Sequence, residues 1–349
     1  MAQRHPDPTD PAAGAVTGEA LADHLRAQAT EFLRALRLHR EGGAGMEPDG
    51  AVRALRRSAR RISGSLHTFR PLLDAGWAEA VRPELAWLSG TLALEQAYAA
   101  RLERLLQALH RLSGTPVLPV QAPGPAGVPP APEPTGPAAT ERGKLAVGAA
   151  KAGALLERQL TLARTRAHSA ALQALGGSRF HAVADTVALL ASEVPLTPAA
   201  ATADLRPLAA AAEERLAAAV TALPLMRAGH PYNAEALVHG LSPDPSPHPQ
   251  DGPWHQVRLL LRLHRYAREV LHGDGGPVDV RLTAAGQALD RHRDASEAAT
   301  AAAQAARTPR IAPATAYALG VLHADQRHEV EAARFAFQRF WQKQAVGTS

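Results

Sequence analysis

The amino-acid sequence predicts an all-α fold, and three observations lead to this prediction. Aromatic residues make up only 4% of the chain, whereas alanine and leucine dominate, and this composition favours close-packed helices over β-sheets. Apolar residues recur at spacings of three and four through most of the chain, which is typical of amphipathic helices. Two proline-rich stretches divide these helical segments, so we expect helical bundles joined by extended connections.

The N-terminal part of the chain predicts a tail followed by four helices. Residues 1–19 are polar, contain prolines and lack periodicity, so we expect them to be disordered. An apolar stripe begins at Leu21 and its helix ends at Glu41, while Asp49 is a candidate N-cap for the next helix. The four predicted helices lie at residues 21–41, 50–73, 78–88 and 92–112. Their short links suggest an up-and-down bundle, which forms a first helical half at residues 20–112.

Residues 113–140 are predicted to form a linker between two halves. Nine prolines in 28 residues exclude a helix and favour an extended, semi-rigid segment. The second helical half, residues 141–344, is slightly larger and contains another proline-rich break at residues 242–253. We expect its helices at residues 141–174, 178–192, 204–227, 254–272, 281–306 and 313–344. The two halves and the linker together make one domain at residues 20–344.

Composition excludes several classes of function. The chain has no cysteine, so it has no disulfide, thiol nucleophile, iron-sulfur cluster or cysteine zinc site. No stretch has the length and apolarity of a membrane span or a secretion signal, so we expect a cytoplasmic protein without a membrane partner. The formal net charge of +5 is small for 349 residues. The distribution of the basic residues is therefore more informative than their total.

The predicted helix that follows Asp49 carries a stripe of arginine. It reads AVRALRRSARRISGSLHTF from residue 51, and residues 51–70 include six arginines and no acidic residue. On a helical wheel one face is apolar and comprises Val52, Leu55, Ala59, Ile62, Leu66 and Phe69. The opposite face comprises Arg53, Arg56, Arg57, Arg60, Gly64 and His67. No ion pair within the helix neutralises this stripe, so we expect a polyanionic ligand to compensate it.

A similar stripe appears in the second half, where the chain reads WHQVRLLLRLHRYAREVL from residue 254. Its basic face has the spacing i, i+3, i+7 and i+10 and comprises His255, Arg258, Arg262 and Arg265. The first three of these positions repeat the spacing of Arg53, Arg56 and Arg60 at a distance of 202 residues. We therefore predict an internal repeat whose two basic helices face each other. Arginine suits this role because its planar guanidinium binds phosphate in a bidentate manner.

With these motifs the sequence resembles the CHAD domain, the conserved histidine α-helical domain, over about residues 20–344. The two arginine-rich segments resemble the first and second motifs of the family, including Arg265 and Tyr266 at the end of the second. Supporting matches are HSAALQALGGSRF from residue 168 and LDRHRDA from residue 289. The chain departs from the family pattern in the first motif, where Arg53 replaces the histidine and Ser63 replaces the last basic residue. It also has Leu94-Glu95 where the family has an Arg-Asp pair near the end of the first half.

The resemblance implies two four-helix bundles related by a pseudo-twofold axis, with a basic cleft or pore between them. It also implies binding of inorganic polyphosphate and association with polyphosphate granules. The Glu-x-Glu-x-Lys strand of the CYTH domain, to which many family members are fused, is absent from the sequence. We therefore expect a stand-alone binding module that is not an enzyme. The candidate ligand-binding residues are Arg53, Arg56, Arg57, Arg60, Arg61, His67, His255, Arg258, Arg262 and Arg265.

Two other functions remain open at this point. Nucleic acid is also a polymer of phosphates, although aromatic residues for base stacking are absent from the stripes. A helical scaffold for a protein partner is the other alternative, and it predicts that acidic residues of other helices neutralise the stripes. The histidines lack HExxH-type spacing, so we expect neither a metal nor a cofactor. We expect His292 and Asp294 on a solvated helix face, and a polar network with Arg291 and Arg293 is the alternative. Trp77, Trp87, Trp254 and Trp341 are expected to anchor the core or helix junctions.

Overall fold

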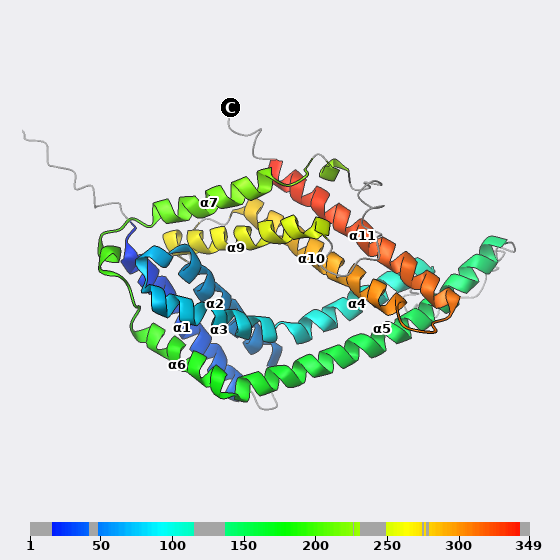
Figure 1. Cartoon of the computed structure of the whole chain (residues 1–349), viewed down its shortest axis with the longest axis horizontal. Helices are drawn as coiled ribbons and strands as arrows, with labels where there is room; N and C mark the ends of the chain where they lie inside the picture. Colours follow the sequence, from blue (N-terminus) through cyan, green and yellow to red (C-terminus); the bar gives the residue numbers. More distant parts are fainter. Residues whose placement is uncertain are drawn as a thin grey trace, which may run out of the picture. The chain divides into compact units, whose positions relative to one another are not determined.

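The computed structural model describes residues 16–41, 48–114, 137–225, 227–230, 249–273, 276 and 279–342. Within these ranges the chain is all-α and has no β-strand, which confirms the predicted fold class (Figure 1). None of the helices in these ranges is both long and apolar enough to cross a lipid bilayer. Most of the predicted tail, linker and second proline-rich break lies outside the described residues.

The helices follow the predicted order with small shifts at their ends. In the first part of the chain they are α1 (Gly18–Glu41), α2 (Pro48–Thr68), α3 (Ala75–Thr91) and α4 (Leu94–Ser113). The later helices are α5 (Pro137–Gly176), α6 (Ser178–Ser192), α7 (Arg206–Thr221), α9 (Gly252–His272), α10 (Val280–Ala306) and α11 (Pro313–Gln342). Short 3-10 helices connect them, among them η1 (Arg70–Leu72), η2 (Pro198–Ala201) and η4 (Pro249–Asp251).

Local chemistry explains several of these boundaries. Pro71 has no N–H to continue α2, so the chain turns into η1 instead of extending the helix to Leu73 as predicted. The carboxylate of Asp74 accepts a hydrogen bond of 2.7 Å from the backbone N–H of Trp77 and thereby caps α3. Gly273 ends α9 with a φ of 65°, a conformation that glycine adopts without strain.

The chain forms two compact units, and each is assembled from separate segments. The first unit contains residues 1–93, 167–222 and 256–282. The second unit contains residues 94–166, 223–255 and 283–349. Both units therefore combine parts of the two halves that the sequence divides at the proline-rich linker.

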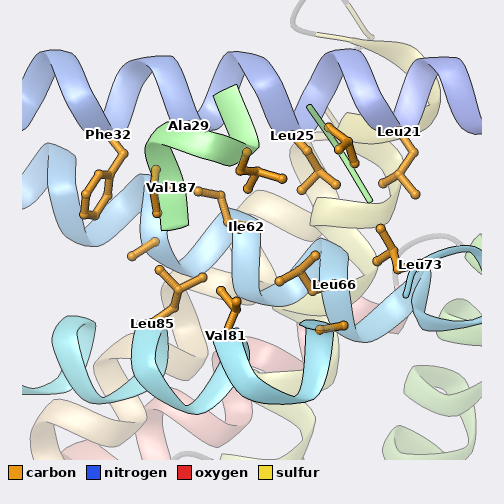
Figure 2. Close-up of a cluster of buried hydrophobic side chains, with 14 of the residues drawn as sticks. Leu21, Leu25, Ala29, Phe32, Ile62, Leu66, Leu73, Val81, Leu85 and Val187 are labelled. Atoms are coloured by element: carbon orange, nitrogen blue, oxygen red, sulfur yellow. The ribbon is translucent and has the colours of Figure 1, made fainter. Parts of the chain in front are cut away.

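The first unit is built on a four-helix bundle of α1, α2, α3 and α6, in which each helix contacts two others. Its core contains large side chains that are fully buried, including Phe32, Ile62 and Leu85 (Figure 2). An antiparallel bridge between Leu73 and Leu196 ties the end of η1 to the segment before η2. The fourth helix of the bundle is α6, whereas the sequence suggested α4. An apolar stripe identifies the buried face of a helix but not the helix that packs against it.

The second unit contains a smaller, alanine-rich core. It is formed by α4, α5, α10 and α11, with side chains such as Leu105, Leu156, Ala302 and Leu319. Alanine allows helices to approach closely, and at Gly148 of α5 an added Cβ would lie only 2.2 Å from the carbonyl oxygen of Ala314. The second core thus comes from four helices, whereas the first core also includes side chains of α7 and α9.

Candidate functional site

The predicted two faces of α2 are present in the first unit. Its apolar face is buried, with Leu55, Ile62 and Leu66 fully inaccessible, and only Val52 of the predicted set stays half-buried. On the opposite face Arg53 and Arg57 are exposed. Burial of the apolar side fixes the rotation of the helix, so the arginine side is directed away from the bundle core.

Arg56 and Arg60 are held more closely than the other arginines of this face. Both side chains are half-buried, and their Nε atoms are shielded from solvent. The aliphatic stem of an arginine packs on apolar surface while its charged end reaches outward. These two guanidinium groups are therefore better ordered than surface arginines, which reduces the entropy lost when they bind a ligand.

The helix α9 packs directly on the basic face of α2. A Cβ placed on Gly64 would lie 2.5 Å from Cδ2 of Tyr266 and 3.5 Å from Cδ2 of Leu263. Tyr266 follows Arg262 by four residues, so it lies on the basic face of α9. The predicted basic faces of the two helices therefore meet at this crossing, and glycine at position 64 makes the close approach possible.

We expect the Gly64→Ala variant to be less stable than the wild-type protein by about 1–3 kcal/mol. The new methyl group must displace the ring of Tyr266, and such overpacking of a helix crossing costs energy of this order. Gly90→Ala in α3 is the matched control, because no atom lies within 4 Å of a Cβ at that position. The free energy of unfolding from urea denaturation should fall only for Gly64→Ala, and equal values for both variants would disprove the close packing.

An ion pair accompanies the crossing of α2 and α9. The Nε of Arg61 donates to Oε2 of Glu269 at 2.6 Å, and its Nη2 lies 3.3 Å from Oε1. About a quarter of each side chain is exposed, namely 28% for Arg61 and 24% for Glu269. Arg61 was predicted to bind the ligand, but it already has a carboxylate partner from the facing helix. The sequence signal was available, because Glu269 follows Arg262 by seven residues and lies on the same face.

His67 lies at the C-terminal end of α2 in a strongly positive environment. Its Nδ1 accepts a hydrogen bond of 3.0 Å from Nη2 of Arg82 in α3, since a guanidinium can only donate. Partial burial of the ring lowers the pKa of His67 below its usual 6.5, and the charges of Arg82, Arg215 and Arg70 lower it further. His67 is therefore a neutral acceptor at neutral pH. Neither Arg82 nor Arg215 was predicted, because neither belongs to a run of basic residues on one helix face.

The remaining predicted residues lie along α9. His255 is half-buried at the start of the helix and belongs to the second unit, where its ring lies edge-on to that of His292 at 5.6 Å. Arg258 and Arg262 are half-buried, and Arg265 is exposed, all three in the first unit. His264, on another side of α9, is buried, which agrees with a packing role.

A buried polar network in the second unit was not predicted. Asp251 has no exposed surface and accepts hydrogen bonds from Nη1 of Arg327 at 2.8 Å and from Nη2 of Arg334 at 2.6 Å. Ser296 also donates to this carboxylate, and Arg334 makes a second ion pair of 2.6 Å with Glu331. Asp251 lies in the proline-rich break predicted at residues 242–253, where an isolated acidic residue carries no pattern.

His292 belongs to this network and is 1% exposed, so its predicted position on a solvated face is wrong. Burial lowers the pKa of His292 to about 4, against the opposing effect of Asp251. Burial would raise the pKa of Asp251, but the neighbouring His292 side chain and the hydrogen bonds from Arg327 hold it well below its usual value. Both pKa values are lower in the folded state than in the unfolded chain, so the free energy of unfolding falls as the solution becomes acidic. The contribution of His292 decreases below about pH 6.5 and that of Asp251 below about pH 4.

Comparison with known proteins finds one family model and similar solved structures. The family model of the CHAD domain matches residues 27–306. Among solved structures, PptA from Streptomyces chartreusis is 70% identical, with 94% of this chain and 99% of that chain covered and a TM-score of 0.77. The CHAD domain from the plant Ricinus communis is 17% identical, with 97% of this chain and 96% of that chain covered and a TM-score of 0.48. No curated protein matches the chain.

Proposed function

Because this chain belongs to the CHAD domain family, we propose that it binds inorganic polyphosphate through the basic faces of α2 and α9, without catalysing a reaction. The observation that carries this proposal is the packing of these two faces at Gly64 and Tyr266. It brings two arginine-bearing helices together within the first unit, although they lie about 200 residues apart in the sequence.

The proposed ligand contacts come from arginines that flank this crossing. Arg56 and Arg60 of α2, and Arg258 and Arg262 of α9, are half-buried, so their guanidinium groups are positioned before a ligand arrives. Arg53, Arg57 and Arg265 are exposed and add charge around them. Successive phosphoryl groups would displace counterions, so the affinity should fall steeply with salt concentration. Binding of this kind predicts that the protein associates with polyphosphate granules.

Arg61 and His255 take different places in the proposal. The pairing of Arg61 with Glu269 is what the scaffold alternative predicts for a neutralised stripe, so Arg61 contributes little net charge. His255 begins α9 and its ring packs on buried His292, so it is held in place by the second unit. The test therefore includes outcomes for the two alternatives, nucleic acid and a protein partner.

The test is a titration of long-chain polyphosphate and of a mixed-sequence DNA duplex against matched variants. The binding variant replaces four arginines by alanine at positions 56, 60, 258 and 262. The control variant removes the same charge from arginines that already pair with a neighbouring carboxylate, at positions 26, 34, 37 and 206. We expect polyphosphate affinity to fall at least about 100-fold in the first variant, since each charged contact is worth about 1 kcal/mol or more.

The control variant should bind within about threefold of the wild-type protein. If both quadruple variants lose the same affinity, general charge and not these helices explains binding. Equal wild-type affinity for DNA at equal phosphate concentration supports the nucleic-acid alternative. A wild-type chain that binds neither polymer at low salt contradicts the proposal and leaves the scaffold for a protein partner.

A further inference from the structure

A second set of positive charges gathers around His67, a predicted site residue, and its arginines were not among the positions predicted from the sequence. It includes Arg70 from η1, Arg82 from α3 and Arg215 from α7, each of which acts electrostatically on His67. All three elements contact α2 within the first unit. Basic side chains of the consecutive elements α2, η1 and α3 are therefore joined by Arg215 of α7, which is more than 130 residues away in the sequence.

The charges in this set are not equally compensated. Arg70 forms an ion pair with Glu79 of α3. Among the residues that the structure describes, neither Arg82 nor Arg215 pairs with a carboxylate, and the shielded Nε of Arg82 has no hydrogen-bond partner. Like charges that lie together without acids raise the energy of the empty site, so an anion is bound favourably there.

The crossing with α9 separates this set from the other arginines of α2. Tyr266 covers the basic face at Gly64, and Glu269 compensates Arg61 one turn earlier. Arg53, Arg56 and Arg60 therefore precede the crossing, and His67 follows it on the same side of the helix. The stripe that the sequence shows as continuous is divided into two segments by the packed helix.

The hydrogen bond between Arg82 and His67 links anion binding to a proton. Nδ1 of His67 can accept from Arg82 only while the imidazole is neutral, because a protonated ring has donors on both nitrogens. An anion that draws the guanidinium of Arg82 toward itself breaks this hydrogen bond. It also supplies the negative charge that stabilises an imidazolium, so His67 can then be protonated and donate to the same anion.

We propose that His67, Arg82 and Arg215 form a phosphoryl-binding subsite that takes up a proton from solvent when a polyphosphate segment binds. The inference rests on the proposed function and adds to it three points of contact beyond the crossing. In the empty protein His67 is neutral, because burial and three guanidinium groups disfavour its charge. In the complex the added anion reverses this balance. Affinity for polyphosphate therefore rises as the pH falls from about 7.5 to about 6.

The experiment is calorimetric titration of the full chain with long-chain polyphosphate at pH 7, in two phosphate-free buffers of different ionisation enthalpy. The difference in heat between the buffers gives the number of protons taken up. His67→Gln keeps an oxygen that can accept from Arg82 but cannot be charged. Arg82→Ala and Arg215→Ala remove the two guanidinium groups, and Arg206→Ala, on the same helix as Arg215 and paired with Asp204, is the matched control.

We expect proton uptake by the wild-type protein and a clear reduction in His67→Gln, which should still bind. Arg82→Ala and Arg215→Ala should each reduce the slope of log affinity against log salt by about one, whereas Arg206→Ala leaves it unchanged. Orthophosphate at equal phosphate concentration should cause no comparable proton uptake.

Wild-type proton uptake in His67→Gln, or wild-type salt slopes in both arginine variants, overturns the subsite while leaving polyphosphate binding intact. Equal proton uptake with orthophosphate overturns the assignment to a polymer. A wild-type chain that does not bind polyphosphate at all contradicts the proposed function itself. Circular dichroism of each variant shows whether it retains the helical fold.

Discussion

Asp251→Ala is expected to lower the free energy of unfolding by about 3–5 kcal/mol. The carboxylate is completely buried and receives hydrogen bonds from Arg327, Arg334 and Ser296. Its removal leaves two guanidinium groups that are 3% and 5% exposed, with Glu331 as the remaining acid beside Arg334. An uncompensated buried charge is among the most costly defects that a single substitution produces.

Two further variants make the Asp251 prediction specific. Asp251→Asn keeps the shape and part of the hydrogen bonding, so its loss should be smaller than that of the alanine variant. Asp294→Ala removes a half-exposed partner of Arg293 in the same unit and should change stability by less than about 1 kcal/mol. Urea denaturation at neutral pH measures all three. Similar losses for Asp251→Ala and Asp294→Ala would contradict a structural role for the buried network.

Trp254→Ala is expected to cost a similar amount, about 3–5 kcal/mol, for a different reason. The indole is 1% exposed and fills the space between His292, stacked at 5.6 Å, and Phe337, edge-on at 5.7 Å. The guanidinium of Arg334 lies 5.3 Å from the centre of the ring. Truncation therefore leaves a cavity beside the polar network and removes a cation–π contact.

Trp254→Phe separates packing from hydrogen bonding at this position. The indole N–H makes no hydrogen bond to any residue that the structure describes, so phenylalanine loses volume but no bond. We expect the phenylalanine variant to retain more than half of the stability that the alanine variant loses. Trp87→Ala is the control, because that ring is half-buried and carries Arg179 on its face. Denaturation curves that rank Trp87→Ala as the most damaging would contradict the assignment of Trp254 as the anchor.

Helix positions followed closely from the sequence, whereas helix partners did not. The predicted helix at residues 178–192 coincides with α6, because its ends are set by local chemistry. That α6 joins the first bundle in place of α4 depends on its contacts with α3 and α1, whose residues lie about 90–170 positions earlier in the chain. An apolar stripe has the same appearance whichever helix covers it, so periodicity alone does not determine the packing.

Some residues of the candidate site could likewise be predicted from the sequence, and others could not. The two basic faces were visible from spacing, and the crossing at Gly64 brings them together. Arg82 and Arg215 carry no local pattern, and only the fold brings them near His67. Asp251 escaped notice because a buried ion pair and a solvated acid look identical in a sequence. Long-range pairing of single charged residues is the information that the sequence of one chain lacks.

The segmented make-up of the first unit has a consequence for the order of events during synthesis. Its core begins with Leu21 and is completed by Ala267 and Val270 of α9. A growing chain therefore exposes part of this core until Val270, of 349 residues, has left the ribosome. At translation rates of about 5–20 residues per second, roughly 4–16 s pass between the synthesis of the end of α6 at Ser192 and that of Val270. Contacts of such long range also slow folding, so the first unit should need chaperones until α9 has been synthesised. This helix also carries the second arginine stripe.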